Sequence, residues 1–164
     1  MVMWEQFDHN EVWLLVMNGI AYFILYLIRN RFSHSTLILS LLWGLSIGTI
    51  FDFTLGGGLM DFYRVNDLDR YEGGDVLYYL LFAPFGYFYL YFSEVLKVRG
   101  KGVILYILSW ALIGLFMQWL FTLTDILTLQ RGYKLTYSFP VFLVTQSLTA
   151  LFIQSLKSKK RKNN

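Results

Sequence analysis

The sequence predicts an all-α fold, a polytopic transmembrane bundle of five helices. Hydrophobic residues make up 56% of the 164 positions and charged residues only 15%, whereas a soluble domain carries about 25% charge. The apolar residues also gather in long runs that are apolar on all sides, while a soluble helix buries a single stripe. The basic residues are also more numerous in the connections on one side of the predicted bundle than on the other, as in membrane proteins of defined orientation.

Five segments are apolar and long enough to cross a hydrocarbon layer about 30 Å thick at about 1.5 Å per residue. They are residues 12–28, 36–53, 76–92, 103–127 and 137–156. Because a backbone in lipid must satisfy its own hydrogen bonds, each segment is expected to be a helix. We therefore predict one domain, a bundle over residues 1–156, followed by a basic cytoplasmic tail over residues 157–164.

The distribution of Lys and Arg predicts the orientation of the bundle. With the N-terminus outside, ten of the 14 basic residues lie in the cytoplasmic connections or the tail. The reverse orientation would invert this ratio, so the positive-inside rule favours an external N-terminus and a cytoplasmic C-terminus in a cell membrane. The acidic residues lie almost entirely at the outer end, which makes that face acidic.

The connection between the second and third helices, residues 54–75, is the one long outer loop. Glycines bracket it, and the segment 59–63 between them combines apolar, aromatic and acidic residues. We expect this segment to form a short amphipathic helix or a re-entrant turn, because long loops in compact domains are often functional.

Polar residues inside or near the outer half of the helices are the candidate ligand-binding residues. Two interpretations are open: an outward-opening polar pocket for a cation or small ligand, or helix ends and interhelical hydrogen bonds of structural value only. The candidates are Asn18, Asp52, Asp61, Gln118, Thr122, Asp125 and Gln146.

Small residues at a spacing of four form a ridge on the second helix, made of Ser40, Gly44 and Gly48. Asp52 continues this ridge, so the same packing that lets helices approach closely should turn Asp52 toward the bundle. The ridge could alternatively supply the contact face of a homodimer.

Several classes of chemistry are disfavoured. The chain has no cysteine and only two histidines, His9 and His34, in different segments, so thiolate chemistry and a Cys/His metal site are excluded. The hydrolase motifs HExxH and SxxK are missing from the sequence, and no nucleophile elbow is expected, because the GxSxG string at residues 44–48 lies within a predicted spanning helix and not at a strand-to-helix turn. No cofactor and no metal are expected. The basic tail predicts contact with anionic lipid more readily than with nucleic acid, and its residues are Lys157, Lys159, Lys160, Arg161 and Lys162.

Four stretches resemble small multi-pass membrane proteins of Bacillus and related spore-forming, Gram-positive bacteria. They are FDFTLGGGLMDFYRVND (51–67), YLLFAPFGYFYLYF (79–92), SWALIGLFMQWL (109–120) and YSFPVFLVTQSLT (137–149). The resemblance covers nearly everything from the second helix onward. It implies a cell-membrane location and carries over neither an activity nor catalytic residues.

The leading hypothesis is a non-enzymatic membrane protein that acts in interaction, sensing or small-ligand binding at its acidic outer face. One alternative is a small homodimeric transporter or a cation or proton pathway that uses Asp52 and Asp125. The other is an intramembrane hydrolase, which would need these two carboxylates close together on facing helices.

Overall fold

A computed structural model describes residues 9–56, 59–65 and 73–162. Its five long helices are α1 (His9–Ile28), α2 (His34–Leu55), α3 (Gly73–Val95), α4 (Gly102–Leu123) and α5 (Ser138–Lys162), with short 3-10 turns at Arg29–Arg31 and Leu135–Tyr137. Each of the five is long and apolar enough to cross a membrane. The prediction of five helices is confirmed at this level.

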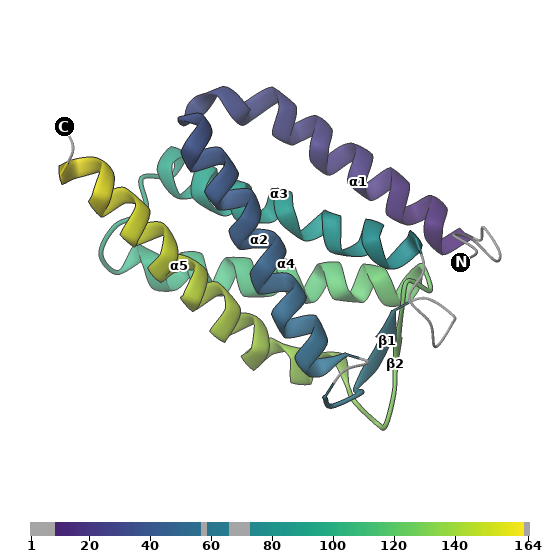
Figure 1. The fold of residues 1–164 in the computed structure, drawn as a ribbon. Helices are drawn as coiled ribbons and strands as arrows, with labels where there is room; N and C mark the ends of the chain where they lie inside the picture. Colours follow the sequence, from purple (N-terminus) through teal and green to yellow (C-terminus); the bar gives the residue numbers. More distant parts are fainter. Residues whose placement is uncertain (1–8, 57–58, 66–72, 163–164) are drawn as a thin grey trace.

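Two short strands add a feature that the sequence analysis missed. The strands β1 (Tyr63–Val65) and β2 (Leu127–Leu129) pair antiparallel, with Arg64 opposite Thr128. The ladder lies at one end of the bundle, beyond the last turn of α2, and the C-terminus lies at the opposite end (Figure 1). We call these the ladder end and the Lys157 end.

The expected amphipathic helix over residues 59–63 is not formed, and the alternative of a re-entrant turn stays a prediction. Residues 59 and 60 make a turn, Asp61 adopts a positive φ of 52°, and Tyr63 begins β1. Aromatic and β-branched residues favour a pleated, half-buried strand, and β2 supplies the hydrogen-bond partners that a strand requires. The rest of the acidic stretch, residues 66–72, lies outside the described residues.

The helices form two packed groups. The first consists of α1, α2 and α3, with α3 between the other two; the second is the α4–α5 hairpin. Ser33 begins α2 by accepting a hydrogen bond from the Thr36 N–H at 3.4 Å, a common N-terminal cap. α1 is attached to α3 by polar contacts, among them Tyr87 donating to the Ile28 carbonyl at 2.8 Å.

The α2 ridge packs against α3 of the same chain. A methyl group added to Gly44 would lie 2.5 Å from the Phe82 carbonyl oxygen, and one added to Gly86 would lie 2.8 Å from the Gly44 nitrogen. Ser40 is fully buried in this contact. Ser40, Gly44 and Gly48 therefore bring two helices of one subunit together, and in this conformation they are not exposed for a homodimer. The prediction that the ridge faces the bundle is confirmed.

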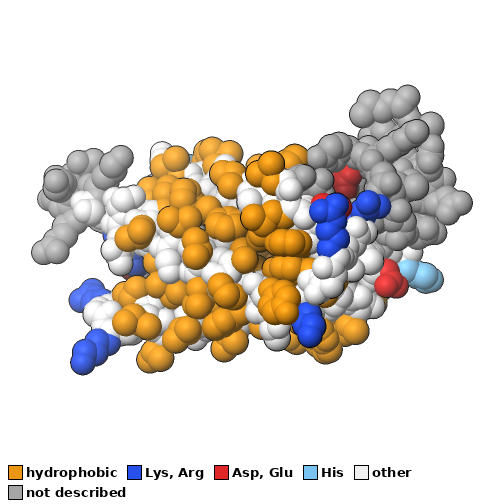
Figure 2. All heavy atoms as spheres, turned by 90° about the horizontal axis from the view of Figure 1, so that it is seen from below, with side chains coloured by type: hydrophobic (Ala, Val, Ile, Leu, Met, Phe, Trp, Pro, Cys, Tyr) orange, Lys and Arg blue, Asp and Glu red, His pale blue; other side chains and the backbone are white. Residues whose placement is uncertain are grey.

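The outside of the bundle is apolar along its middle. Large hydrophobic side chains such as Phe23, Ile104 and Leu151 are more than 60% exposed. Figure 2 shows hydrophobic side chains covering the central part of one face, with charged side chains toward both ends. Exposed apolar surface of this extent is expected where lipid is the solvent, since each helix is already hydrogen-bonded within itself.

Candidate functional site

A cavity of about 170 Å³ lies between the two helix groups. Its walls come from the halves of α2, α3, α4 and α5 nearest the ladder, and Tyr63 and Leu127 of the ladder itself also contribute. On α2 the lining runs from Trp43 in the middle of the helix to Leu55 at its end. The cavity therefore extends from the ladder end to about half the depth of the bundle.

Aromatic rings surround this cavity. Trp43 stacks on Phe152 with centroids 4.2 Å apart, and Tyr89 lies 5.3 Å from Trp110. Trp43, Tyr89 and Trp110 line the cavity near mid-bundle. Further rings of the wall come from every neighbouring helix and from β1, and they are Phe51, Tyr63, Tyr78, Phe82, Phe85, Phe121 and Phe142.

The Asp52 carboxylate is the one charged group in the described lining. It is 5% exposed and accepts three tyrosine hydroxyl hydrogen bonds. Tyr63 and Tyr78 donate to Oδ1 at 2.9 and 3.3 Å, and Tyr79 donates to Oδ2 at 3.0 Å. Neutral donors from α3 and β1 thus stabilise a buried carboxylate that would otherwise be costly.

The Tyr63 hydroxyl stays protonated in this arrangement. Burial, and after it the nearby charge of Asp52, raise the pKa of Tyr63 above its ordinary value. A phenol in that state donates its proton in a hydrogen bond and carries no charge of its own. Tyr63 therefore acts as a fixed donor that ties the ladder to the end of α2.

Gln118 supplies an unsatisfied polar atom on the α4 side of the cavity. The side chain is 6% exposed, and its Oε1 atom has no hydrogen-bond partner among the described residues. Because native structures leave few buried polar atoms without a partner, such an atom in a cavity wall needs an explanation. A bound ligand or an ordered water that donates a hydrogen bond would supply one.

The predicted site residues separate into three groups. Asp52, Gln118 and Gln146 line the cavity. Asn18 is buried between α1 and α3, where it donates to the Leu14 and Leu77 carbonyls at 2.9 Å, so it has the interhelical role that was the structural alternative. The remaining three lie at the ladder end outside the cavity lining, and they are Asp61, Thr122 and Asp125.

Asp125 and Asp52 do not face each other across a common site. Asp125 is exposed, has a positive φ of 56° and lies in the turn after α4, while Asp52 is enclosed by tyrosines. Asp61 pairs with Arg131 at 2.8 Å and lies 3.8 Å from Arg64. The carboxylate pair that the hydrolase alternative requires is therefore not assembled in this structure.

The tyrosines around Asp52 were missed as site residues. The sequence analysis named neither Tyr78 nor Tyr79, and it placed Tyr63 only within the outer-loop segment 59–63. Their spacing from Asp52 along the chain carries no periodic signal, since the contact joins three different elements. One signal in the sequence could have suggested them. Asp52 was expected to face the bundle from a helix without Lys or Arg, and a buried carboxylate needs hydrogen-bond donors.

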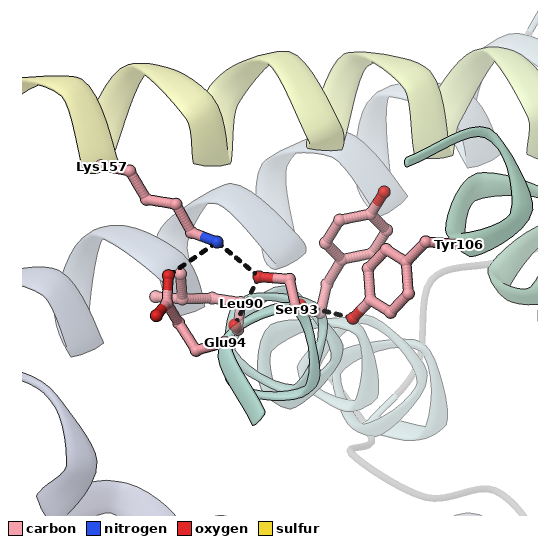
Figure 3. A network of polar contacts seen from close by, with 6 residues as sticks. Leu90, Ser93, Glu94, Tyr106 and Lys157 are labelled. Atoms are coloured by element: carbon pink, nitrogen blue, oxygen red, sulfur yellow. Dashed lines mark hydrogen bonds and ion pairs between the residues drawn. The ribbon is translucent and has the colours of Figure 1, made fainter. Parts of the chain in front are cut away.

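At the opposite end, Lys157 joins the two helix groups. Its Nζ lies 2.7 Å from Oε1 of Glu94 and donates to the Ser93 hydroxyl at 3.0 Å, while Tyr106 donates to the Tyr89 carbonyl at 2.7 Å (Figure 3). Lys157 was expected to contact anionic lipid, but here it forms an ion pair within the chain. The side chains of the other four basic tail residues lie outside the described part.

The comparisons with known proteins return no relative of this chain. No family model, no curated protein and no solved structure matches it. The functional argument therefore rests on the chain's own geometry.

Proposed function

We propose that this chain is a non-enzymatic, multi-pass protein of the cell membrane that binds a small, largely apolar ligand within its helical bundle. The observation that carries the proposal is the cavity between the two helix groups, with a Gln118 oxygen in its wall that has no partner in the described part of the chain. Ligand sites are concave and mostly apolar, with a few convergent polar groups. The resemblance to the Bacillus proteins agrees with this location and adds no activity.

The proposed orientation has the ladder end outside and the Lys157 end in the cytoplasm. The positive-inside distribution supports it, because the connections at the Lys157 end hold most of the Lys and Arg residues. The cavity would then be on the extracellular half of the bundle. Contact of the remaining tail residues with anionic lipid belongs to the same proposal.

The size of the cavity sets the scale of the ligand. A cavity of about 150 Å³ lined by Leu, Ile and Phe stays dry and binds benzene, so about 170 Å³ suits a molecule of one aromatic ring with a small substituent. A probe of this size should bind without rearrangement of the helices.

A cavity-filling variant tests the proposal. Val141 lines the cavity on α5, whereas Val144, three residues further on, is 53% exposed and outside the lining. We expect Val141→Trp to abolish the thermal stabilisation by benzene-sized probes, because the indole occupies their space, and Val144→Trp to leave it intact. Equal stabilisation of both variants would mean that the probes bind elsewhere.

A transport pathway is the second candidate, and the depth of the cavity favours it. The lining reaches the middle of α2 and α3, and substrate sites of transporters lie near the midplane. Passage onward would require the Lys157–Glu94 contact at the other end to open. Flux of a bound probe into proteoliposomes, faster in Lys157→Met than in wild type, would favour transport; binding without flux would favour a receptor-like site.

A further inference from the structure

We infer that the ligand of this cavity is a lipophilic cation, an amine or quaternary ammonium ion that carries one apolar group. The inference rests on the proposed ligand-binding function and adds the charge of the ligand. Three features of the wall carry it: a buried carboxylate, several aromatic rings, and an amide oxygen that has no partner among the described residues.

The carboxylate gives the cavity a negative charge that no basic residue of the wall offsets. Among the described lining residues there is no Lys, Arg or His, and the hydrogen bonds to Asp52 come from neutral hydroxyls. A carboxylate has about four acceptor positions, of which the tyrosines use three. A ligand with a positive charge would therefore gain both Coulomb attraction and, if it carries an N–H group, the last acceptor position.

The aromatic rings of the wall also favour a positively charged group on the ligand. Tyr78 contacts Phe82 and Phe121, with centroids 4.9 and 5.8 Å apart, and all three line the cavity beside Asp52. Rings of this kind attract a cation through their negative faces, as in the aromatic cages that bind quaternary ammonium groups. An anion in the same place would be repelled by both the rings and the carboxylate.

Gln118 adds an acceptor on the opposite helix group. Its Oε1 atom is buried and unpartnered among the described residues, while Asp52 also offers only acceptor atoms. The polar atoms available to a ligand thus include two acceptor groups, which suits a donor or a cation. The rest of the wall is largely apolar and suits a hydrocarbon group of one-ring size.

A pair of isosteric probes tests the charge without changing the shape. Benzyltrimethylammonium has a positively charged nitrogen at the position where neopentylbenzene has a neutral carbon. The binding of both can be measured by equilibrium dialysis with the protein in phosphatidylcholine nanodiscs. Empty nanodiscs give the lipid background for each probe. We expect the cation to bind at least about tenfold more tightly, which corresponds to about 1.4 kcal/mol of attraction to the Asp52 carboxylate.

Two variants assign that preference to Asp52. Asp52→Asn keeps the shape of the side chain and removes its charge, so the cation should lose its advantage while neopentylbenzene binds as before. Retained binding of the neutral probe also shows that the variant is folded. Asp125→Asn is the matched control, because Asp125 is exposed and outside the lining, and it should leave both affinities unchanged.

The possible outcomes separate the two proposals. If both probes bind, both are excluded by Val141→Trp, and the neutral probe binds as tightly as the cation, the charge inference is overturned and the ligand-binding function stands. A cation preference that survives undiminished in Asp52→Asn also overturns the inference. If neither probe binds to the wild-type protein, the ligand-binding proposal fails, and the charge inference fails with it.

Discussion

At the scale of single residues, Asp52 determines the character of the site. The side chain comes from α2, yet the atoms that stabilise it come from α3 and β1, with oxygen–oxygen distances of 2.9 to 3.3 Å. Each hydrogen bond to a charged group contributes about 1.5–3 kcal/mol, and together they offset much of the cost of burying the carboxylate. The cluster therefore holds the end of α2 against α3 and also sets the polarity of the cavity.

Tyr63→Phe tests this cluster at one atom. The substitution removes a single donor and should lower the free energy of unfolding by about 1–3 kcal/mol, since a buried acceptor loses a partner. Tyr137→Phe is the matched control, because Tyr137 is 54% exposed. Thermal unfolding in detergent micelles measures both. If the two variants unfold at the same temperature as wild type, the hydrogen bond to Asp52 contributes nothing to stability.

Predictions for single residues succeeded where the sequence showed a helical repeat. The spacing of Ser40, Gly44, Gly48 and Asp52 correctly predicted that Asp52 faces the bundle, since positions four apart share one helix face. The three tyrosines were not found, because their contacts with Asp52 join elements that no period relates. Asp125 was a candidate for the same pocket as Asp52 but lies in an exposed turn, because α4 ends at Leu123, four residues before the predicted boundary.

At the scale of elements, α2 and α3 are in close backbone contact. Gly44 and Gly86 allow the two backbones to approach until neither position has room for a side-chain carbon. In membranes, where the hydrophobic effect does not drive helices together, close packing of this kind supplies much of the association energy.

Gly44→Ala tests that contact. The added carbon would lie 2.5 Å from the Phe82 carbonyl oxygen, and backbone atoms cannot rotate away, so we expect a loss of about 1–3 kcal/mol. Gly19→Ala is the control, since a carbon there meets nothing within 4 Å. Thermal unfolding should separate the two variants. An unchanged midpoint for Gly44→Ala, or an equal loss for Gly19→Ala, would contradict the packing described.

The five helices were predictable and the two strands were not. Length and uniform apolarity identify a spanning helix because the bilayer imposes both. Strands of three residues carry no comparable signal, and here each needs the other, from a different connection, to form. The prediction of a helix over residues 59–63 was wrong for this reason. The strand β2, which pairs with β1, lies more than 60 residues away in the sequence.

At the scale of the whole molecule, two helix groups meet around the cavity and are joined at both ends. At the ladder end the strands pair and Asp61 binds Arg131; at the other end Lys157 binds Glu94. Between these ends, Trp43 donates to the Thr149 hydroxyl at 3.1 Å. This arrangement leaves space between the groups while fixing their relative position, which suits a preformed binding site.

The orientation in the membrane is testable because the natural sequence has no cysteine. Single variants His9→Cys and Asn164→Cys can be treated on intact cells with a membrane-impermeant maleimide. We expect His9→Cys to react from outside and Asn164→Cys to react only after lysis, as the positive-inside distribution requires. The opposite pattern would reverse the orientation and place the cavity in the cytoplasmic half.

The most direct test of the ligand-binding site is the position of a bound probe. Iodobenzene approximates the cavity in size, and its iodine can be located by anomalous diffraction from crystals of the protein. We predict one dominant peak between α2 and α4, in the space lined by Gly48, Gln118 and Val141, that disappears in Val141→Trp. Peaks confined to the lipid-facing surface, or an empty cavity at saturating probe, would contradict the proposal that this bundle holds a small ligand.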